Sequence, residues 1–411
     1  MSTTIKVRPL SLAPTYNETI VVLESTNIAV SDFKWLVSIY RGVSIDSDYE
    51  LISSLVILPN PEGYGVIDFH RHIENHISST FTPEYVDLIS GKVESEGLKW
   101  SFEVSEYVSG AEVPQSLPAN SNLIYSFNGA LSFQDFRNWD SSDYEMSTNS
   151  LPSTKFLIDR DTTIDASLSD RVWINSFMSP SVTSFELLEI ETDNGTYTVD
   201  QTFTPSGQHF INQNKIGAKD ILESSDTFTV VSGALPVVDL DTTFIKVTPL
   251  NGGSIAIGET VTLNIKDYCS KHEEIRFFYM DKLGSYLPIT FNKVSKTNVT
   301  NERSSYKQNY GAYNSTSVEW GYNPHDRGTT TYDITTKEVV TCTSDWLTEE
   351  ASRMVLSMLN SPNVYIQSSI GEYIAINITT NSYEDKKTVN EKLINYTISF
   401  EYAQTNTNQR G

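Results

Sequence analysis

The chain has 411 residues, of which 38% are hydrophobic, 11% are aromatic and 20% are charged, and its formal net charge is −23 at pH 7. At roughly 100–200 residues per domain, this length predicts two to four domains that each bury a core. The acidic surface would repel phosphate backbones, which excludes sequence-specific nucleic-acid binding over a broad face. The chain has only two cysteines, which excludes a fold held together by several disulfide bonds.

The first part of the chain, residues 1–112, is predicted to form an N-terminal β module. In the segment 33–40, Phe33, Trp35, Val37 and Ile39 recur with the period of two that a strand buried on one face requires. Further strands are expected at 19–23, 51–58 and 99–108, with a turn cluster at 59–65. A helical stripe is made by Phe69, Ile73 and Ile77, and Asp68 is its expected N-cap.

Residues 113–265 are predicted to form a second, middle β module. A Pro-, Ser- and Asn-rich loop at 113–122 marks its start, and strands are expected at 123–127 and 172–177. The clearest hairpin lies at 185–199, where Asn194 and Gly195 supply the positive φ angles that a two-residue turn demands. The segments 244–250 and 261–265 repeat this pattern less cleanly.

Residues 266–411 are predicted to form a C-terminal β module that carries one helix. Strands are expected at 274–280, 286–291, 373–379 and 396–402, with a turn at 281–284. The helix spans about 348–360, begins at the cap Thr348 and ends before Pro362. Its apolar stripe consists of Leu347, Ala351, Met354, Val355, Met358 and Leu359. The predicted fold class is therefore mainly β, with two or three β-sandwich-like modules and one amphipathic helix against a sheet.

Between these elements, residues 298–331 lose their aliphatic side chains and become rich in Tyr, Asn, Ser and Gly. Such a stretch is either an exposed loop or an extended polar arm. It holds a series of aromatic residues, namely Tyr306, Tyr310, Tyr313, Trp320 and Tyr322. Aromatic anchors on a polar background are typical of surfaces that bind a partner. The alternative is that the loop folds over its own domain and buries these rings there.

Two clusters in the sequence contain residue types that commonly bind metal ions. His72 and His76 share one face of the expected helix beside His70, yet Ile73 stands where a metalloprotease has its glutamate, and no third ligand is identifiable. Asp159, Asp161 and Asp165 offer oxygen ligands, but their spacing departs from the calcium loop of an EF-hand. A solvated helix edge and an acidic loop are the simpler interpretations, so no metal site is predicted.

Signatures of catalysis are missing as well. The sequence has no G-x-S-x-G elbow, no Walker A motif and no complete dinucleotide fingerprint, and neither Cys269 nor Cys342 lies in a thiol-enzyme motif. Carboxylate pairs that meet only in space stay open, because sequence does not reveal them. We therefore predict a non-enzymatic protein without a cofactor.

The sequence also addresses the environment of the protein. No apolar run reaches the ~20 residues that span a bilayer, and the first residues lack the apolar core of a signal peptide. We expect a soluble protein that does not insert into membranes. Its acidity has two interpretations, namely that it keeps an abundant protein soluble or that it lines a passage through which DNA slides.

Several segments resemble virion proteins of tailed phages that infect Bacteroidetes, including crAss-like phages. They are Cys269, IRFFYMDKLGSY at 275–286, SDWLTEE at 344–350, SPNVY at 361–365 and the ending from FEYA at 400–403 to QRG at 409–411. The N-terminal segment 33–40, followed by PNP at 59–61 and Gly65, is similar in those proteins. The resemblance covers about a third of the chain, and none of its motifs is catalytic.

This resemblance implies a structural subunit of a virion tail, tail tip, baseplate or neck, made in the cytoplasm of the host bacterium. Its partners would be other copies of itself and neighbouring virion proteins, and its arm would clasp a neighbouring subunit in a closed ring. The same features describe a host-recognition or glycan-binding β-sandwich protein, similar to an adhesin, in which exposed aromatic rings stack on sugars. A β-rich glycan hydrolase would be a third class.

Overall fold

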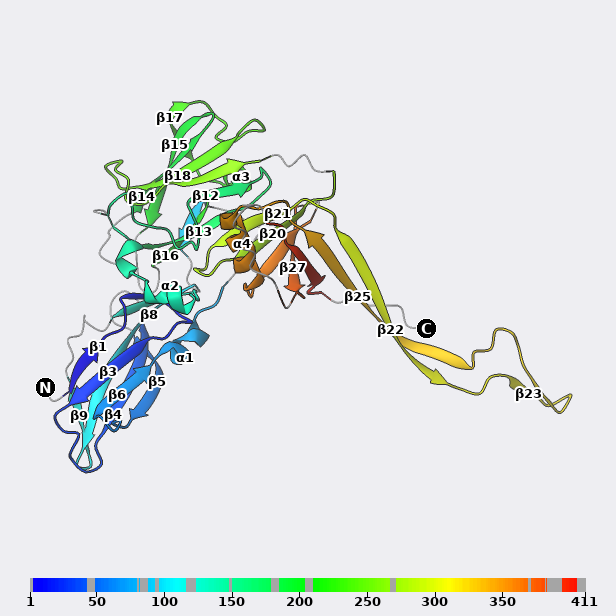
Figure 1. Cartoon of the computed structure of the whole chain (residues 1–411), viewed down its shortest axis with the longest axis horizontal. Coiled ribbons are helices and arrows are strands. Elements are labelled where there is room, and N and C mark those ends of the chain that lie inside the picture. The colour runs from blue at the N-terminus through cyan, green and yellow to red at the C-terminus, as the bar shows by residue number, and fades with distance from the viewer. Residues whose placement is uncertain are drawn as a thin grey trace. The chain divides into compact units, whose positions relative to one another are not determined.

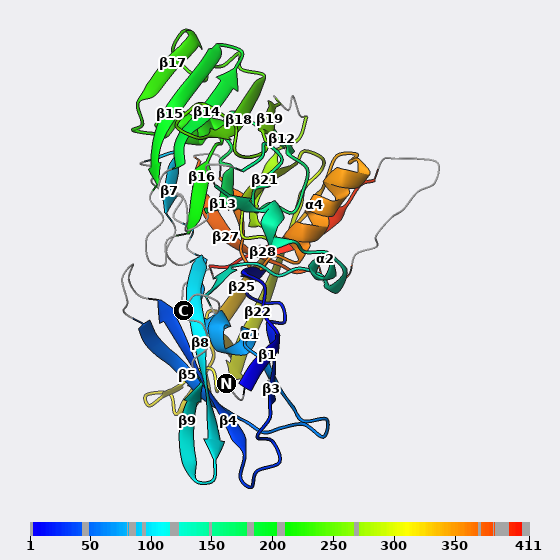
Figure 2. The ribbon, with the colours of Figure 1, turned by 90° about the vertical axis from the view of Figure 1, so that its left-hand side faces the viewer.

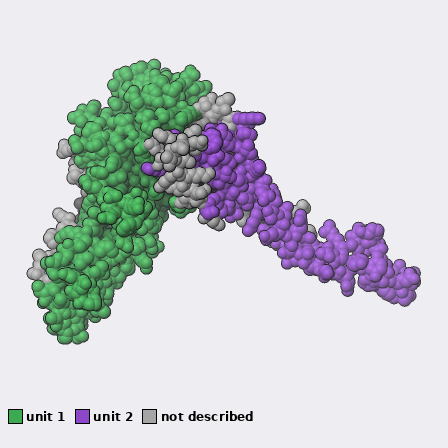
Figure 3. All heavy atoms as spheres, viewed as in Figure 1, with its two compact units in different colours: residues 1–268, 278–289, 360–362 green, residues 269–277, 290–359, 363–411 purple. Residues whose placement is uncertain are grey.

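The computed structural model describes residues 3–42, 49–79, 81, 88–92, 96–115, 123–147, 150–178, 185–203, 210–266, 271–368, 371–380, 382 and 394–404. Of the described residues, 50% lie in strands and 9% in helices, which confirms the mainly β fold class with sandwich-like sheets. The chain divides into two compact units, drawn in two colours in Figure 3. Unit 1 holds residues 1–268, 278–289 and 360–362, and unit 2 holds 269–277, 290–359 and 363–411. The division into three modules at 112 and 265 stays a prediction.

The N-terminal part of unit 1 consists of two antiparallel sheets around one core (Figure 1). The first sheet has the order β1 (Thr3–Val7), β3 (Ile20–Ser25), β6 (Tyr64–Asp68). The second has the order β2 (Leu12–Pro14), β10 (Ile124–Phe127), β8 (Gly97–Val108), β4 (Lys34–Gly42), β5 (Tyr49–Ile57), with β9 (Ala111–Gln115) beside β8. Only β2 runs parallel to its neighbour, β10. Residues of both sheets, including Val21, Trp35 and Trp100, fill the shared core.

Local sequence patterns explain this core. Phe33, Trp35, Val37 and Ile39 are all buried, as the period of two predicts. The expected helical stripe lies on a short helix, α1 (His70–Ile73), followed by the 3₁₀ turn η1 (Glu74–His76). Asp68 is not the N-cap residue itself, because Phe69 takes that position. The Asp68 carboxylate nevertheless accepts a hydrogen bond from the backbone N–H of His70 at 3.3 Å.

A third sheet of unit 1, which we call the middle sheet, is formed by strands from the middle of the chain (Figure 2). Its order is β12 (Thr163–Ala166), β19 (Val261–Ile265), β18 (Phe244–Leu250), β14 (Phe185–Thr192), β15 (Gly195–Phe203), β17 (Phe228–Gly233). The predicted hairpin is β14–β15, but its register differs by one residue, because Thr192 pairs with Gly195 across the turn. The central turn residues are therefore Asp193 and Asn194, neither of which has a positive φ, and the expected Asn-Gly turn is wrong.

Unit 1 also holds a sheet in which buried polar residues are common. It contains β21 (Tyr286–Phe291), β13 (Trp173–Met178), β16 (Ile211–Lys215) and β7 (Ser90–Lys92), with β11 (Glu145–Met146) beside β13. Short helices of this unit are α2 (Phe133–Arg137), η3 (Ser141–Asp143) and α3 (Ala218–Glu223). Asp220 of α3 is buried, where it pairs with Arg171 at 2.8 Å and accepts a hydrogen bond from the Trp173 indole at 3.1 Å.

Unit 2 contains the strand order β22 (Lys296–Lys307), β25 (Thr329–Thr343), β28 (Thr397–Tyr402), β27 (Tyr373–Ile378), β26 (Val364–Gln367). The strands β20 (Ile275–Met280) and β21 contribute residues to both units. Helix α4 (Glu349–Leu359) matches the predicted amphipathic helix, and the Thr348 hydroxyl accepts a hydrogen bond from the Ala351 N–H at 3.2 Å. Val355 and Met358 of its stripe are buried.

Candidate partner-binding site

The predicted arm is a long two-stranded β ribbon in unit 2, which we call the arm ribbon and define as residues 296–343 (Figure 1). The strands β22 and β25 pair antiparallel from Lys296 opposite Thr341 to Lys307 opposite Thr329, with a register shift after Ser304. Threonine recurs along both strands, which also hold valine and tyrosine, and β-branched and aromatic residues favour this extended backbone. The segment 298–331 is therefore mostly strand rather than an irregular loop.

The far end of the arm ribbon is a smaller two-stranded piece. It consists of β23 (Ala312–Asn314) and β24 (Glu319–Gly321), with Tyr313 opposite Trp320. The side-chain oxygen of Asn314 accepts a hydrogen bond from the N–H of Thr316 at 2.9 Å, which closes the turn between the two strands. This polar capping lets the tip keep a defined shape although it has no buried apolar residue of its own.

The five aromatic residues of the predicted interface all project from the arm ribbon. Their exposed fractions run from 47% for Tyr306 to 66% for Tyr322. The rings of Tyr310 and Tyr322 lie 5.4 Å apart between centroids, and the Trp320 indole N–H donates to the Tyr310 carbonyl oxygen at 3.1 Å. The structure thus gathers Tyr310, Tyr313, Trp320 and Tyr322 at the tip, and these rings are not buried in a core.

Tyr306 belongs to a separate pair that the sequence did not reveal. Its ring lies 6.2 Å from the ring of Tyr332 on β25, which is also about half exposed. Tyr332 follows three consecutive threonines, and this run of residues that favour strands was the signal that could have found it. The role of these residues in binding a partner stays a prediction.

Members of both candidate metal clusters have other polar partners. The Nδ1–H group of His70 donates a hydrogen bond to the Asp68 Oδ2 atom at 2.7 Å. Asp165 lies on β12 and pairs with Lys266, whereas Asp159 pairs with Lys282 at 3.0 Å. Within the described ranges, no group of three or more His, Cys, Asp or Glu side chains is placed to hold a metal ion. Cys269 lies outside the described residues.

Sequence reasoning also missed a buried polar network in unit 1, centred on the Glu96 carboxyl. The Asn175 side-chain amide donates to the Glu96 Oε2 atom at 2.6 Å and to the Gly284 carbonyl oxygen at 3.0 Å. The Ser285 hydroxyl accepts a hydrogen bond from the Asn175 backbone N–H at 2.9 Å. Burial, and to a lesser extent the nearby Asp281 charge, raises the pKa of Glu96 to about 8, although the hydrogen bonds from Asn175 and Ser79 lower it.

Asp281 links this network to the turn between β20 and β21. Its carboxylate accepts hydrogen bonds from the backbone N–H groups of Leu283 and Ser285 at 2.9 Å each, and from that of Asp159 at 2.9 Å. Burial raises the pKa of Asp281 to about 7 despite these donors. Both carboxyls are buried, so they are placed to organise the fold rather than to meet a sugar substrate.

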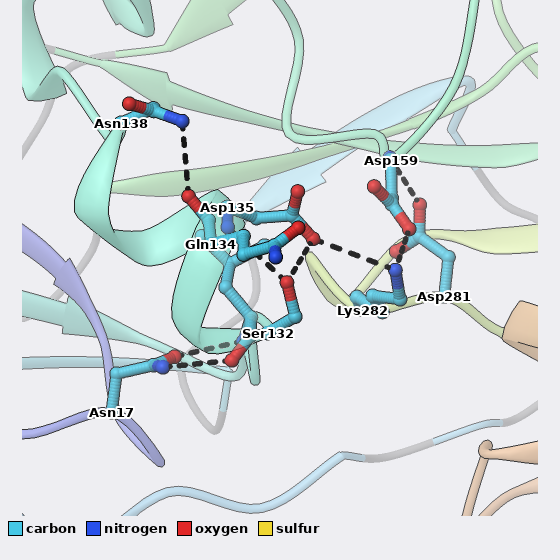
Figure 4. Close-up of polar contacts among 9 residues, drawn as sticks. Asn17, Ser132, Gln134, Asp135, Asn138, Asp159, Asp281 and Lys282 are labelled. Atoms are coloured by element: carbon cyan, nitrogen blue, oxygen red, sulfur yellow. Dashed lines mark hydrogen bonds and ion pairs between the residues drawn. The ribbon is translucent and has the colours of Figure 1, made fainter.

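Lys282 connects the same turn to the surface of unit 1. Its ammonium group lies 3.0 Å from Asp159 and 3.8 Å from Asp135 of α2, as Figure 4 shows. The N-cap Ser132 donates its hydroxyl hydrogen bond to Asp135 at 2.7 Å. These groups are partly exposed, so each ion pair contributes about 1 kcal/mol or less. Lys282 thus forms ion pairs with two carboxylates at the surface of unit 1.

Comparison with known proteins adds little to this picture. No protein-family model and no curated protein sequence matches the chain. One solved structure, titled "Crystal structure of CBD12 from CALX1.2", is 9% identical, with 65% of this chain and 100% of that chain covered and a TM-score of 0.15. A likeness this weak shows neither a shared fold nor a shared function. Among the described residues, the helices are all too short or too polar to cross a membrane.

Proposed function

We propose that this protein is a non-enzymatic structural subunit that assembles through its arm ribbon, and that it serves in the tail of a tailed-phage virion. The observation that carries the proposal is the exposure of the ribbon, since every residue of β22 is exposed along twelve consecutive positions. The placement in a phage tail rests on the sequence resemblance, which implies the neck, tail tip or baseplate as alternatives to the tail itself.

A free ribbon of this kind lacks the usual source of stability. An isolated two-stranded hairpin is marginally stable in water, and a third strand or a packed apolar face is needed for independent stability. Among the described residues, β25 meets β28 only from Val339 to Thr343, so most of the ribbon has two strands alone. We infer that a partner molecule supplies the missing surface in the assembled state.

The aromatic residues give the ribbon enough apolar area to bind. A buried Tyr or Trp side chain removes roughly 150–250 Å² from water, and the five rings are about half exposed. Covering roughly 100 Å² on each ring at about 25 cal/mol per Å² contributes on the order of 12 kcal/mol. Association itself costs about 4–15 kcal/mol, so these rings decide whether the arm binds at all.

A second candidate function is favoured by the exposure of the tyrosines at the tip. Tyr313 and Tyr322 are 60% and 66% exposed, as they would be in a site that stacks on sugars. In that case the protein would be a host-recognition module, and its arm would bind a bacterial surface glycan rather than another subunit. Mass measurement separates the two, because glycan recognition does not require the chain to assemble.

The test is the mass of the purified chain by light scattering, alone and with neighbouring virion proteins. The informative variant replaces residues 299–338 with an Asn-Gly turn, because Asn298 and Val339 are already partners across the ribbon. The wild type is expected to form a defined ring, alone or with a partner, and the shortened variant to stay monomeric with an unchanged melting transition. A wild-type chain that stays monomeric in both conditions contradicts the proposal.

Substitutions at the tip sharpen this test. Trp320→Ala is expected to weaken assembly at least tenfold, because a partner that covers the half-exposed indole would lose this apolar contact. Phe133→Ala is the matched control, since Phe133 is 80% exposed on α2, outside the arm ribbon. Equal effects of both substitutions would show that exposed aromatic residues in general, and not the arm, drive association.

A further inference from the structure

The strand β17 forms an open edge of the middle sheet (Figure 2). Its pairing partner within the described part of the chain is β15, and five of its six residues are exposed. Val230 and Val231 are 42% and 60% exposed, and Val231 is the bulged residue that has no partner on β15. Edge strands are usually protected by charges or prolines, and β17 has neither. Its bulge is the one protective device it has.

The sheet that ends at β17 is acidic. Its six strands hold five acidic residues and one basic residue, a net charge of 1 − 5 = −4. The basic residue, Lys246, is already paired with Glu191. An added strand at this edge would therefore be favoured if it carried positive charge.

The arm ribbon offers such a strand. The twelve residues of β22 include Lys296, Arg303 and Lys307 against Glu302, a net charge of 3 − 1 = +2 in a chain whose net charge is −23. Its partner in the described residues is β25, so the other edge of β22 is open. Lysines on an edge discourage indiscriminate pairing, and the same charges select an acidic edge over a neutral or basic one.

We propose that β22 of one copy adds edge to edge to β17 of a second copy of this chain. This inference rests on the proposed function and names the surface that the arm ribbon binds. The main-chain groups of two open edges would pair, Val230 and Val231 would be covered, and the ribbon would gain the third strand that it lacks. Because the two edges differ, the contact is head to tail, and repetition generates a ring if its rotation closes.

The first test exchanges charge between the two edges and measures mass by light scattering over a range of concentrations. Thr229→Lys with Val231→Lys adds positive charge to β17, and Arg303→Glu with Lys307→Glu reverses the charge of β22. Each pair alone is expected to raise the dissociation constant at least tenfold, and all four together to restore it to within about threefold of the wild type. Val56→Lys is the control, since Val56 is 59% exposed on β5, an edge strand of another sheet.

The second test mixes two deficient chains. The β17 lysine variant keeps its arm, and the shortened-arm variant keeps its β17 edge, so the mixture is expected to form a 1:1 complex that neither chain forms alone. No complex in the mixture, or an equal loss caused by Val56→Lys, overturns the inference.

The failure of this inference differs from the failure of the proposed function. If shortening the arm abolishes assembly while the lysine substitutions at β17 leave it unchanged, the arm binds elsewhere and only the inference is wrong. If the wild type assembles only with a different virion protein, the second-copy partner is likewise wrong while the arm keeps its role. If the wild type stays monomeric with every partner, both are wrong.

Discussion

The buried carboxyl of Glu96 makes the stability of unit 1 depend on pH in a direction opposite to that of a surface acid. The pKa of Glu96 is raised from 4.5 to about 8 in the folded chain, because burial disfavours the charged form. Between these two values the unfolded chain ionises this group and the folded chain does not. The contribution of Glu96 to the free energy of unfolding is therefore fully present below about pH 4.5 and is lost as the pH rises from there through about 8.

The size of the effect follows from linkage. One pKa unit corresponds to ~1.36 kcal/mol, so a rise from 4.5 to about 8 amounts to roughly 3–4 kcal/mol between pH 5 and pH 8. Asp281, whose pKa is raised to about 7, acts in the same direction. Asp68, whose pKa is lowered, titrates below this window and does not offset the trend.

The perturbation is Glu96→Gln, which keeps the shape of the side chain but cannot ionise. We expect the variant to lose most of the decline in urea stability from pH 5 to pH 8 and to be more stable than the wild type at pH 8. The fluorescence of the buried Trp100 and Trp173 reports the transition of this unit. Glu62→Gln, at an exposed turn, is the control and should leave the pH profile unchanged. A wild-type chain that gains stability from pH 5 to pH 8 refutes the reasoning.

Three further predictions concern packing. A Cβ atom at Gly195, which has a φ of +148°, would lie 2.1 Å from a backbone oxygen of β17. Gly195→Ala should therefore lower the free energy of unfolding in urea by about 2 kcal/mol or more. Gly91→Ala is the control and should lower it by less than about 1 kcal/mol, because nothing lies within 4 Å of a Cβ atom there. Asp220→Ala leaves a buried arginine without its main partner and should lower the free energy of unfolding by about 3–5 kcal/mol, measured in the same way. Burial raises the pKa of the Cys342 thiol to about 12, so in a Cys269→Ser background a thiol reagent should label the chain only after denaturant is added, and rapid labelling of the native chain would contradict this burial.

The elements that the sequence predicted are those whose pattern is local. The alternation of Phe33, Trp35 and Val37 specifies a strand with one buried face, and Thr348 specifies the start of a helix. The exposure of the arm ribbon was also predictable from its loss of aliphatic residues, because such a segment has little to bury. Its pairing as a ribbon was not, since no short turn motif lies between β22 and β25.

The elements that sequence reasoning missed depend on contacts between distant residues. Strand β16 is buried although it reads Ile-Asn-Gln-Asn-Lys, because its polar side chains bond to other strands. The Asn212 amide donates to the Ser90 hydroxyl at 2.6 Å, and the Asn214 amide donates to the Ile174 carbonyl oxygen at 3.2 Å. A polar segment like this resembles a loop until its partners are known, and the network around Glu96 was hidden for the same reason.

The positions of β17 and β22 at sheet edges also depend on contacts between distant residues. The run Phe-Thr-Val-Val in β17 is a pattern that usually lies inside a sheet, and only the strand order places it at an edge. The polar run of β22 is the pattern of a protected edge, and its charge is opposite to that of the sheet that ends at β17. Neither strand indicates an interface by its own sequence. The interface is indicated by the combination of an edge without charges or prolines, an exposed ribbon and opposite charges, which are brought together only by the topology of the folded chain.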